Sequence, residues 1–76
     1  MHEYDMHGVP LHDLGVEIDR ALCGAMHDAS QPIVFIHGIG TGTLRDAVHE
    51  ELRCHPLVLR FELSFDGGAT VVWLHN

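Results

Sequence analysis

The amino-acid sequence predicts an α/β fold, a two-layer sandwich in which a four-stranded mixed sheet packs against two helices. Segments with a strand pattern and segments with a helix pattern alternate along the chain in the order β-α-β-α-β-β. The continuously apolar run at residues 33–36 is typical of a central strand that is buried on both faces. The turn signal Asp66-Gly67-Gly68 separates the last two β-favouring segments and indicates a hairpin.

The first half of the chain is expected to form a strand, a helix and a second strand. Residues 3–7 are predicted as a short strand, and residues 33–36 as the second strand. Residues 12–28 are predicted as a helix, because its apolar residues recur at helical spacing and form one stripe: Leu14, Ile18, Ala21, Leu22 and Ala25. Since a helical crossover joins the two strands, we expect them to be parallel.

The second half is expected to form a helix and a hairpin. Residues 43–55 are predicted as the helix, with Thr43 as the N-cap and a buried stripe formed by Leu44, Ala47, Val48 and Leu52. Residues 57–63 alternate in polarity, which predicts a strand with Leu57, Leu59, Phe61 and Leu63 on one face. Residues 69–75 are predicted as the last strand, with Trp73 in the core.

Length and composition favour one small globular domain. We expect a single domain over residues 1–76, either as a whole protein or as part of a longer one. No apolar run approaches the roughly 20 residues that span a bilayer, so we expect no membrane association. The two isolated cysteines, Cys23 and Cys54, form no C-x-x-C pair and are interpreted as buried or idle thiols in a reducing compartment. Because the first residues do not resemble a secretory signal, the expected location is the cytoplasm.

The charge balance limits how a nucleic acid could bind. The chain has four arginines, no lysine and eleven carboxylates, which give a formal net charge of −7. Nucleic-acid-binding proteins usually carry a basic patch. Any such function must therefore depend on a local site, or on positive charge from other domains of a parent protein.

Two histidines are expected at one edge of the sheet. His7 and His37 end the first two predicted strands, and the carboxyl ends of parallel strands lie at the same edge. Asp5 lies two residues before His7, hence on the same face of the strand, where a carboxylate can fix the tautomer of an imidazole. By spacing alone, coincidence remains an equal alternative in a chain with eight histidines.

The segment Gly38-Ile39-Gly40-Thr41-Gly42 leads from the second strand into the second helix. Glycines allow close approach of the backbone, and unpaired N–H groups at a helix start attract anions such as phosphate. Arg45, in the first turn, could clamp a phosphate. The segment lacks the spacing of a dinucleotide fingerprint and the Gly-Lys-Ser/Thr of a P-loop. A tight structural turn and a solvated surface arginine are the alternatives.

Several motifs together resemble the Smr (small MutS-related) domain family. The run Tyr4-Asp5-Met6-His7-Gly8 resembles the Leu-Asp-Leu-His-Gly motif that opens Smr domains. Residues 36–45 resemble their second motif, His-Gly-x-Gly-x-Gly followed by Leu-Arg. The segment His55-Pro56-Leu57-Val58 and the late Gly-Gly-Ala-Thr-Val-Val also match. The resemblance covers nearly the whole chain.

The resemblance implies a fold like the C-terminal domain of translation initiation factor three. It also implies a nucleic acid as partner, either DNA or RNA, and in many members DNA nicking or RNA cleavage. Such activity is linked to DNA repair and recombination or to ribosome-associated RNA processing. This chain departs from the family at Ile39, where many members have lysine or arginine, and it therefore lacks one phosphate contact.

The leading hypothesis is an endonuclease that needs no cofactor on RNA. On DNA a divalent metal could assist, with Asp5 and one or both histidines as ligands. His7 and His37 would be its general base and general acid, with Asp5 orienting His7. Phosphate binding is assigned to Gly38, Gly40, Thr41, Gly42, Thr43 and Arg45.

Two alternatives are a nucleic-acid-binding module without catalysis and a protein-interaction domain whose site has decayed. An exposed apolar patch that includes Trp73 or Ile39 would support the second of these. A structural zinc site is disfavoured, because the histidines lack the usual paired spacing.

Overall fold

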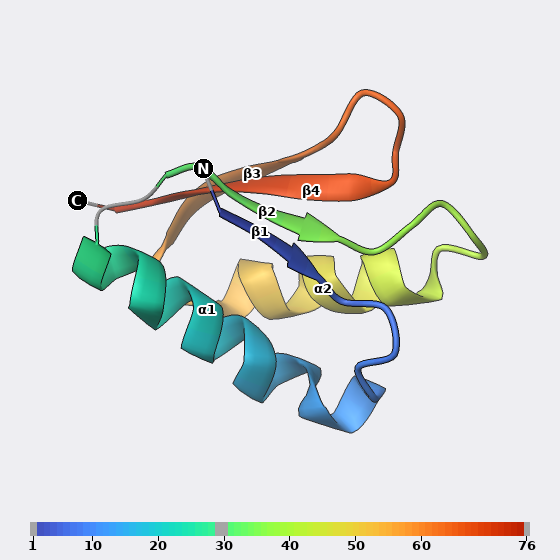
Figure 1. Cartoon of the computed structure of the whole chain (residues 1–76), viewed down its shortest axis with the longest axis horizontal. Helices are drawn as coiled ribbons and strands as arrows, with labels where there is room; N and C mark the ends of the chain where they lie inside the picture. Colours follow the sequence, from blue (N-terminus) through green and yellow to red (C-terminus); the bar gives the residue numbers. More distant parts are fainter. Residues whose placement is uncertain (1, 29–30, 76) are drawn as a thin grey trace.

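The computed structural model describes residues 2–28 and 31–75, and its elements follow the predicted order (Figure 1). The elements are β1 (His2–Asp5), the short 3-10 helix η1 (Leu11–Asp13), α1 (Leu14–Asp28), β2 (Ile33–Ile36), α2 (Thr43–Cys54), β3 (Val58–Leu63) and β4 (Ala69–Leu74). Within the described part of the chain, no helix is long and apolar enough to cross a membrane. The predicted boundaries differ most in β1, which ends at Asp5, so that His7 lies in the following turn.

The strands form one mixed sheet in the order β1-β2-β4-β3. β1 pairs with β2 in parallel, whereas β4 pairs antiparallel with both β2 and β3. Both helices lie on the same side of this sheet, as Figure 1 shows. The two-layer sandwich, the parallel first pair and the final hairpin are therefore confirmed.

The core lies between the sheet and the two helices. The whole predicted stripe of α1 is buried, and Val48 and Leu52 of α2 are buried with it. From the sheet, Ile33 and Phe35 of β2 and Val72 of β4 are fully inaccessible to solvent. Burial of apolar side chains is the main favourable term in folding, so this interface holds the two layers together.

The alternation predicted for residues 57–63 is wrong at Leu59, whose side chain is 56% exposed. The pairing of β3 with β4 is irregular between Val58 and Arg60, which indicates a β-bulge. A bulge inserts one residue into a strand and changes which residues share a face. The bulge places Val58 on the same face as Phe61, and both side chains pack against the core. Leu63 shares this face, opposite Thr70, but its side chain is 45% exposed.

Two other expectations for single residues are wrong, and one is decided in part. The N-cap of α2 is Gly42, in a left-handed conformation, and Thr43 is the first helical residue. Cys23 and Cys54, expected to be buried or idle, are both exposed free cysteines. Trp73 is only half-buried and lies on the opposite face from Val72, where the guanidinium of Arg60 stacks 3.8 Å from the centre of its ring.

Candidate functional site

Three connections leave the sheet at one edge and bring the predicted residues together. Asp5 at the end of β1 is in register with Ile36 at the end of β2, which is in register with Ala69 at the start of β4. The turn after β1, the loop after β2 and the β3–β4 hairpin therefore adjoin one another. The carbonyl of Gly68 in the hairpin accepts hydrogen bonds from both His37 N (3.1 Å) and Gly38 N (2.8 Å).

The first two of these connections enclose a cleft of about 380 Å³ together with the start of α2. Its lining combines the turn after β1 with the whole loop before α2 and the first residues of that helix: His7, Val9, Leu11, His37, Gly38, Ile39, Gly40, Thr41, Gly42, Thr43, Leu44 and Arg45. Every residue assigned to phosphate binding from the sequence lines this cleft. Asp5 does not line it and reaches it through His7.

Asp5 holds the imidazole of His7 in one orientation. Its Oδ1 atom accepts a hydrogen bond from the backbone N–H of His7 (2.9 Å) and lies 2.9 Å from the ring Nδ1. These bonds, the backbone one first, lower the pKa of Asp5 below its ordinary value of 3.8. A carboxylate can only accept, so Nδ1 carries the hydrogen and Nε2 of neutral His7 is free to take up a proton.

Nε2 of His7 lies directly over Gly38. A Cβ atom at position 38 would be 2.7 Å from this nitrogen, closer than real contacts allow. Gly38 also has a φ of +79°, a conformation that favours glycine. Glycine at this position therefore lets the first motif and the second motif meet.

The glycine loop before α2 lines the cleft along its whole length. Gly40 and Gly42 also have positive φ, at 27° and 86°. The N–H groups of Ile39, Gly40, Thr41 and Gly42 have no hydrogen-bond acceptor among residues 2–28 and 31–75. Unpaired N–H groups beside a helix N-terminus form a favourable environment for an anion.

Arg45 supplies positive charge at the same place. Its guanidinium lies against Gly42, where a Cβ atom would approach Nη2 to 2.6 Å. It is also paired with the neighbouring Asp46 carboxylate, at 3.1 Å, and its side chain is 38% exposed. Because this pair is solvent-exposed and weak, the guanidinium can exchange Asp46 for a phosphate at little cost.

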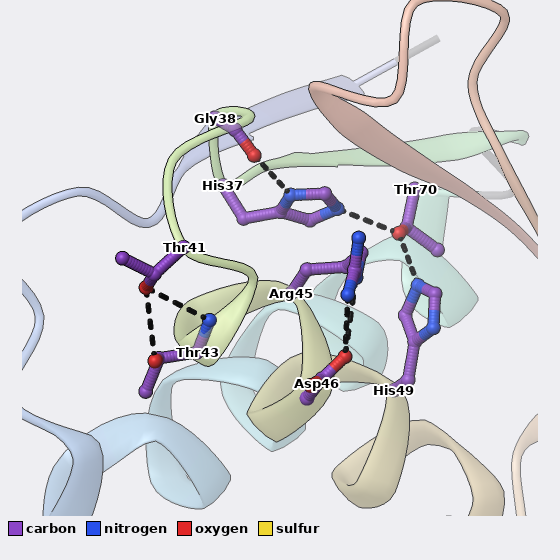
Figure 2. Close-up of polar contacts among 8 residues, drawn as sticks. All are labelled: His37, Gly38, Thr41, Thr43, Arg45, Asp46, His49 and Thr70. Carbon is purple, nitrogen blue, oxygen red and sulfur yellow. Dashed lines mark hydrogen bonds and ion pairs between the residues drawn. The ribbon is translucent and has the colours of Figure 1, made fainter.

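His37 lines the cleft but is only 4% exposed. Its Nδ1 lies 2.9 Å from the carbonyl oxygen of Gly38, and its Nε2 lies 2.9 Å from Oγ1 of Thr70 (Figure 2). Both ring nitrogens thus have partners within the protein. His37 and His7 both line the cleft, and Gly38 is in contact with both side chains.

The sequence analysis missed His49 and Thr70. Nε2 of His49, on α2, lies 2.7 Å from the same Thr70 hydroxyl that contacts His37. Two signals were available in the sequence. Thr70 is a polar residue on the same face of β4 as the buried Val72 and Leu74. His49 follows Arg45 by one helical turn, so both side chains project from the same face of α2.

No group of three or more His, Cys, Asp or Glu side chains within residues 2–28 and 31–75 is placed to hold a metal ion. Among these residues, Asp5 and His7 are the only two His, Cys, Asp or Glu side chains that pair with each other at the cleft.

Comparison with known proteins identifies the family and the fold. Residues 4–75 match the family described as "Smr domain". Proteins named "Endonuclease MutS2" from Thermomicrobium roseum and Brevibacillus brevis are each 40% identical over 76 residues, which cover 95% of this chain and 10% of those proteins. The chain thus spans about a tenth of these relatives. The crystal structure of the Smr domain of Thermus thermophilus MutS2 superimposes with a TM-score of 0.91 at 34% identity, covering 100% of both chains. The chain belongs to the Smr domain family.

Proposed function

We propose that this domain binds nucleic acid at the cleft and cleaves a phosphodiester bond there. The observation that carries the proposal is the position of His7, whose Nδ1 is held by Asp5 while Nε2 faces the glycine loop. A proton acceptor is thereby held next to a group of unpaired N–H donors. The name of the relatives, endonuclease, is consistent with this assignment.

In this mechanism the phosphate binds to the loop and His7 acts as general base. The N–H groups of residues 39–42 and the guanidinium of Arg45 stabilise negative charge on the phosphate oxygens. Nε2 of His7 takes the proton from the attacking oxygen, and the Asp5 carboxylate stabilises the imidazolium that forms. The attacking oxygen, a 2′-hydroxyl in RNA or a water molecule in DNA, forms a bond to phosphorus as the bond from phosphorus to the leaving oxygen breaks. The leaving oxygen takes its proton from bulk water.

We assign His37 a positioning function instead of the general-acid function that its sequence motif suggests. A general acid must reach the leaving oxygen, whereas both nitrogens of His37 have partners within the protein and the side chain is 4% exposed. Its hydrogen bond to the Gly38 carbonyl holds the loop on which the phosphate rests.

The second candidate function is binding without cleavage. Ile39 favours it, because this side chain is 67% exposed beside the cleft at a position where a basic residue would contact a phosphate. The formal net charge of −7 also opposes tight binding by the isolated domain.

A cleavage assay on labelled single- and double-stranded DNA and RNA, with and without a chelator, separates these functions. We expect His7→Ala to lower the cleavage rate about 100-fold or more, the usual contribution of a general base. The matched control is His12→Ala, an exposed histidine outside the cleft that should leave the rate unchanged. Cleavage by His7→Ala at the unaltered rate would overturn the proposal. Salt-sensitive binding without any cleavage would establish the second candidate.

A further inference from the structure

A chain of polar contacts connects helix α2 to the glycine loop through the interior of the domain. Nε2 of His49 contacts the hydroxyl of Thr70 at 2.7 Å, and the same hydroxyl contacts Nε2 of His37 at 2.9 Å. Nδ1 of His37 then contacts the carbonyl oxygen of Gly38 at 2.9 Å. Figure 2 shows the Thr70 hydroxyl between the two rings, with a dashed line to each.

The chemistry of the partners fixes the direction of each hydrogen bond. A carbonyl oxygen only accepts, so the Nδ1 of His37 must carry a hydrogen. In the neutral ring Nε2 is then an acceptor and receives the single hydrogen of the Thr70 hydroxyl. Since that hydrogen is used, Thr70 accepts from His49, whose Nε2 carries a hydrogen. One arrangement of hydrogens therefore satisfies all the groups.

This chain ends on the residue that joins the two sequence motifs. The peptide groups of Gly38 are held on both sides, because its N–H donates to Gly68 and its carbonyl accepts from His37. The carbonyl of Gly38 belongs to the same peptide unit as the N–H of Ile39, the first unpaired donor of the loop. The orientation of that donor is consequently set by the ring of His37.

Packing alone does not explain a threonine at this position. Thr70 is completely buried, and its neighbours on the same face of β4 are the apolar Val72 and Leu74. A buried hydroxyl costs free energy unless it is hydrogen-bonded, and a valine of the same shape would avoid that cost. The hydroxyl is useful only if it bridges the two rings.

We propose that Thr70 and His49 are positioning residues that hold His37 in its Nδ1–H form and thereby fix the glycine loop for binding phosphate. The effect on substrate depends on the function proposed above, whereas the hydrogen-bonding state of His37 does not. His37, Thr70 and His49 act as one unit that never touches the substrate.

The direct test is the ¹⁵N NMR spectrum of the imidazole rings together with a titration of the loop amides with inorganic phosphate. At neutral pH the wild-type domain should show His37 as the Nδ1–H tautomer. In Thr70→Val this signal should shift, the amides of residues 38–42 should move, and phosphate should bind about three- to tenfold more weakly. Thr70→Ser restores the hydroxyl and should retain the wild-type tautomer and affinity.

His49→Phe removes the donor to Thr70 but leaves the Thr70–His37 bond, so its effect on the amides should be smaller. The matched control is His55→Gln, which alters a histidine at the other end of α2 that pairs with Asp19 and should leave residues 38–42 unchanged.

Two results would overturn the proposal: a wild-type His37 with its hydrogen on Nε2, or a folded Thr70→Val with unaltered loop amides and affinity. The position of the hydrogen on His37 can be read from the wild-type spectrum even if Thr70→Val does not fold. A wild-type domain with the Nδ1–H tautomer but no cleavage would contradict the nuclease function and leave this inference intact.

Discussion

At the scale of single residues, the pair formed by Asp5 and His7 determines what the cleft can do. Both side chains are largely exposed, at 67% and 60%, so the pair contributes little to folding. Its significance is geometric, because the carboxylate selects which nitrogen of His7 faces the loop.

We predict that the pKa of Asp5 lies below 3.8 and that His7→Ala raises it only part of the way back. The largest cause of the lowering is the hydrogen bond from the backbone N–H of residue 7, which alanine retains. A depressed carboxyl pKa adds stability that is present above pH 3.8 and lost as the pH falls through the folded-state pKa. A ¹³C NMR titration of the carboxyl group measures both values, and an unchanged midpoint in His7→Ala would contradict the side-chain contact.

Gly38→Ala should abolish the proposed activity, while Gly8→Ala should not. Both glycines have φ near +80°, so each alanine adds backbone strain of about 1–2 kcal/mol. Only at position 38 does the new Cβ meet His7; at Gly8 nothing lies within 4 Å. The His7 ring would have to leave Asp5 in Gly38→Ala. Thermal melts and cleavage rates of the two variants measure the two effects separately, and equal activity in both would count against the contact between the motifs.

At the scale of elements, α2 is joined to the sheet near the cleft by the hydrogen bond between His49 and Thr70. Burial, followed by the neighbouring charges of His37, Arg53 and Arg45, lowers the pKa of His49 below 6.5, and Asp46 partly opposes this.

The unfolded chain therefore takes up this proton first, and we predict that the free energy of unfolding falls as the pH decreases from 6.5 to the folded-state pKa. Above pH 6.5 His49 does not contribute to the dependence of the free energy of unfolding on pH. Chemical denaturation at a series of pH values should show a weaker slope over this window in His49→Gln. An identical slope in both proteins would show that His49 is not the group responsible.

The elements that could be predicted are those with strong periodicity. The apolar stripe of α1 and the apolar run of β2 indicate which side chains are buried. The order of the helices and strands and their arrangement in two layers therefore follow from the sequence. β3 could not be predicted in detail, because a bulge at Leu59 is set by pairing with β4. The cap of α2 was also misassigned, since the left-handed conformation of Gly42 depends on the path of the preceding loop.

Part of the candidate site could also be predicted from the sequence. The meeting of His7 and His37 follows from parallel strands. The contact of Asp5 with His7 was predicted from the period of a strand, but it forms in the turn after β1, which ends at Asp5. The buried state of His37 did not follow from the sequence, because its partner Thr70 lies 33 residues away and the two meet only in the folded sheet. His49 was missed for the same reason.

At the scale of the whole molecule, the chain combines a formal charge of −7 with a cleft in which Arg45 is the only arginine or lysine among the lining residues. Nucleic-acid binding by the isolated domain should therefore be weak. Each phosphate contact contributes a slope of about −0.9 to the dependence of log K on log salt for duplex DNA, or about −0.7 for single strands.

Ile39→Lys should increase the affinity for duplex DNA and make this slope more negative by about 0.9, since it adds one phosphate contact beside the cleft. The matched control is Val16→Lys, which adds the same charge at a 59% exposed position of α1 outside the cleft. Fluorescence anisotropy at several salt concentrations measures both slopes. Equal gains in the two variants would indicate attraction by net charge and no specific site.

An amide and imidazole NMR titration of the wild-type domain with a short single-stranded oligonucleotide locates the surface that binds nucleic acid. The largest shifts should fall on residues 38–45 and on the ring of His7, with little change on the face of the sheet that carries Trp73. Shifts concentrated on that open face, with the glycine loop unaffected, would contradict binding at the cleft.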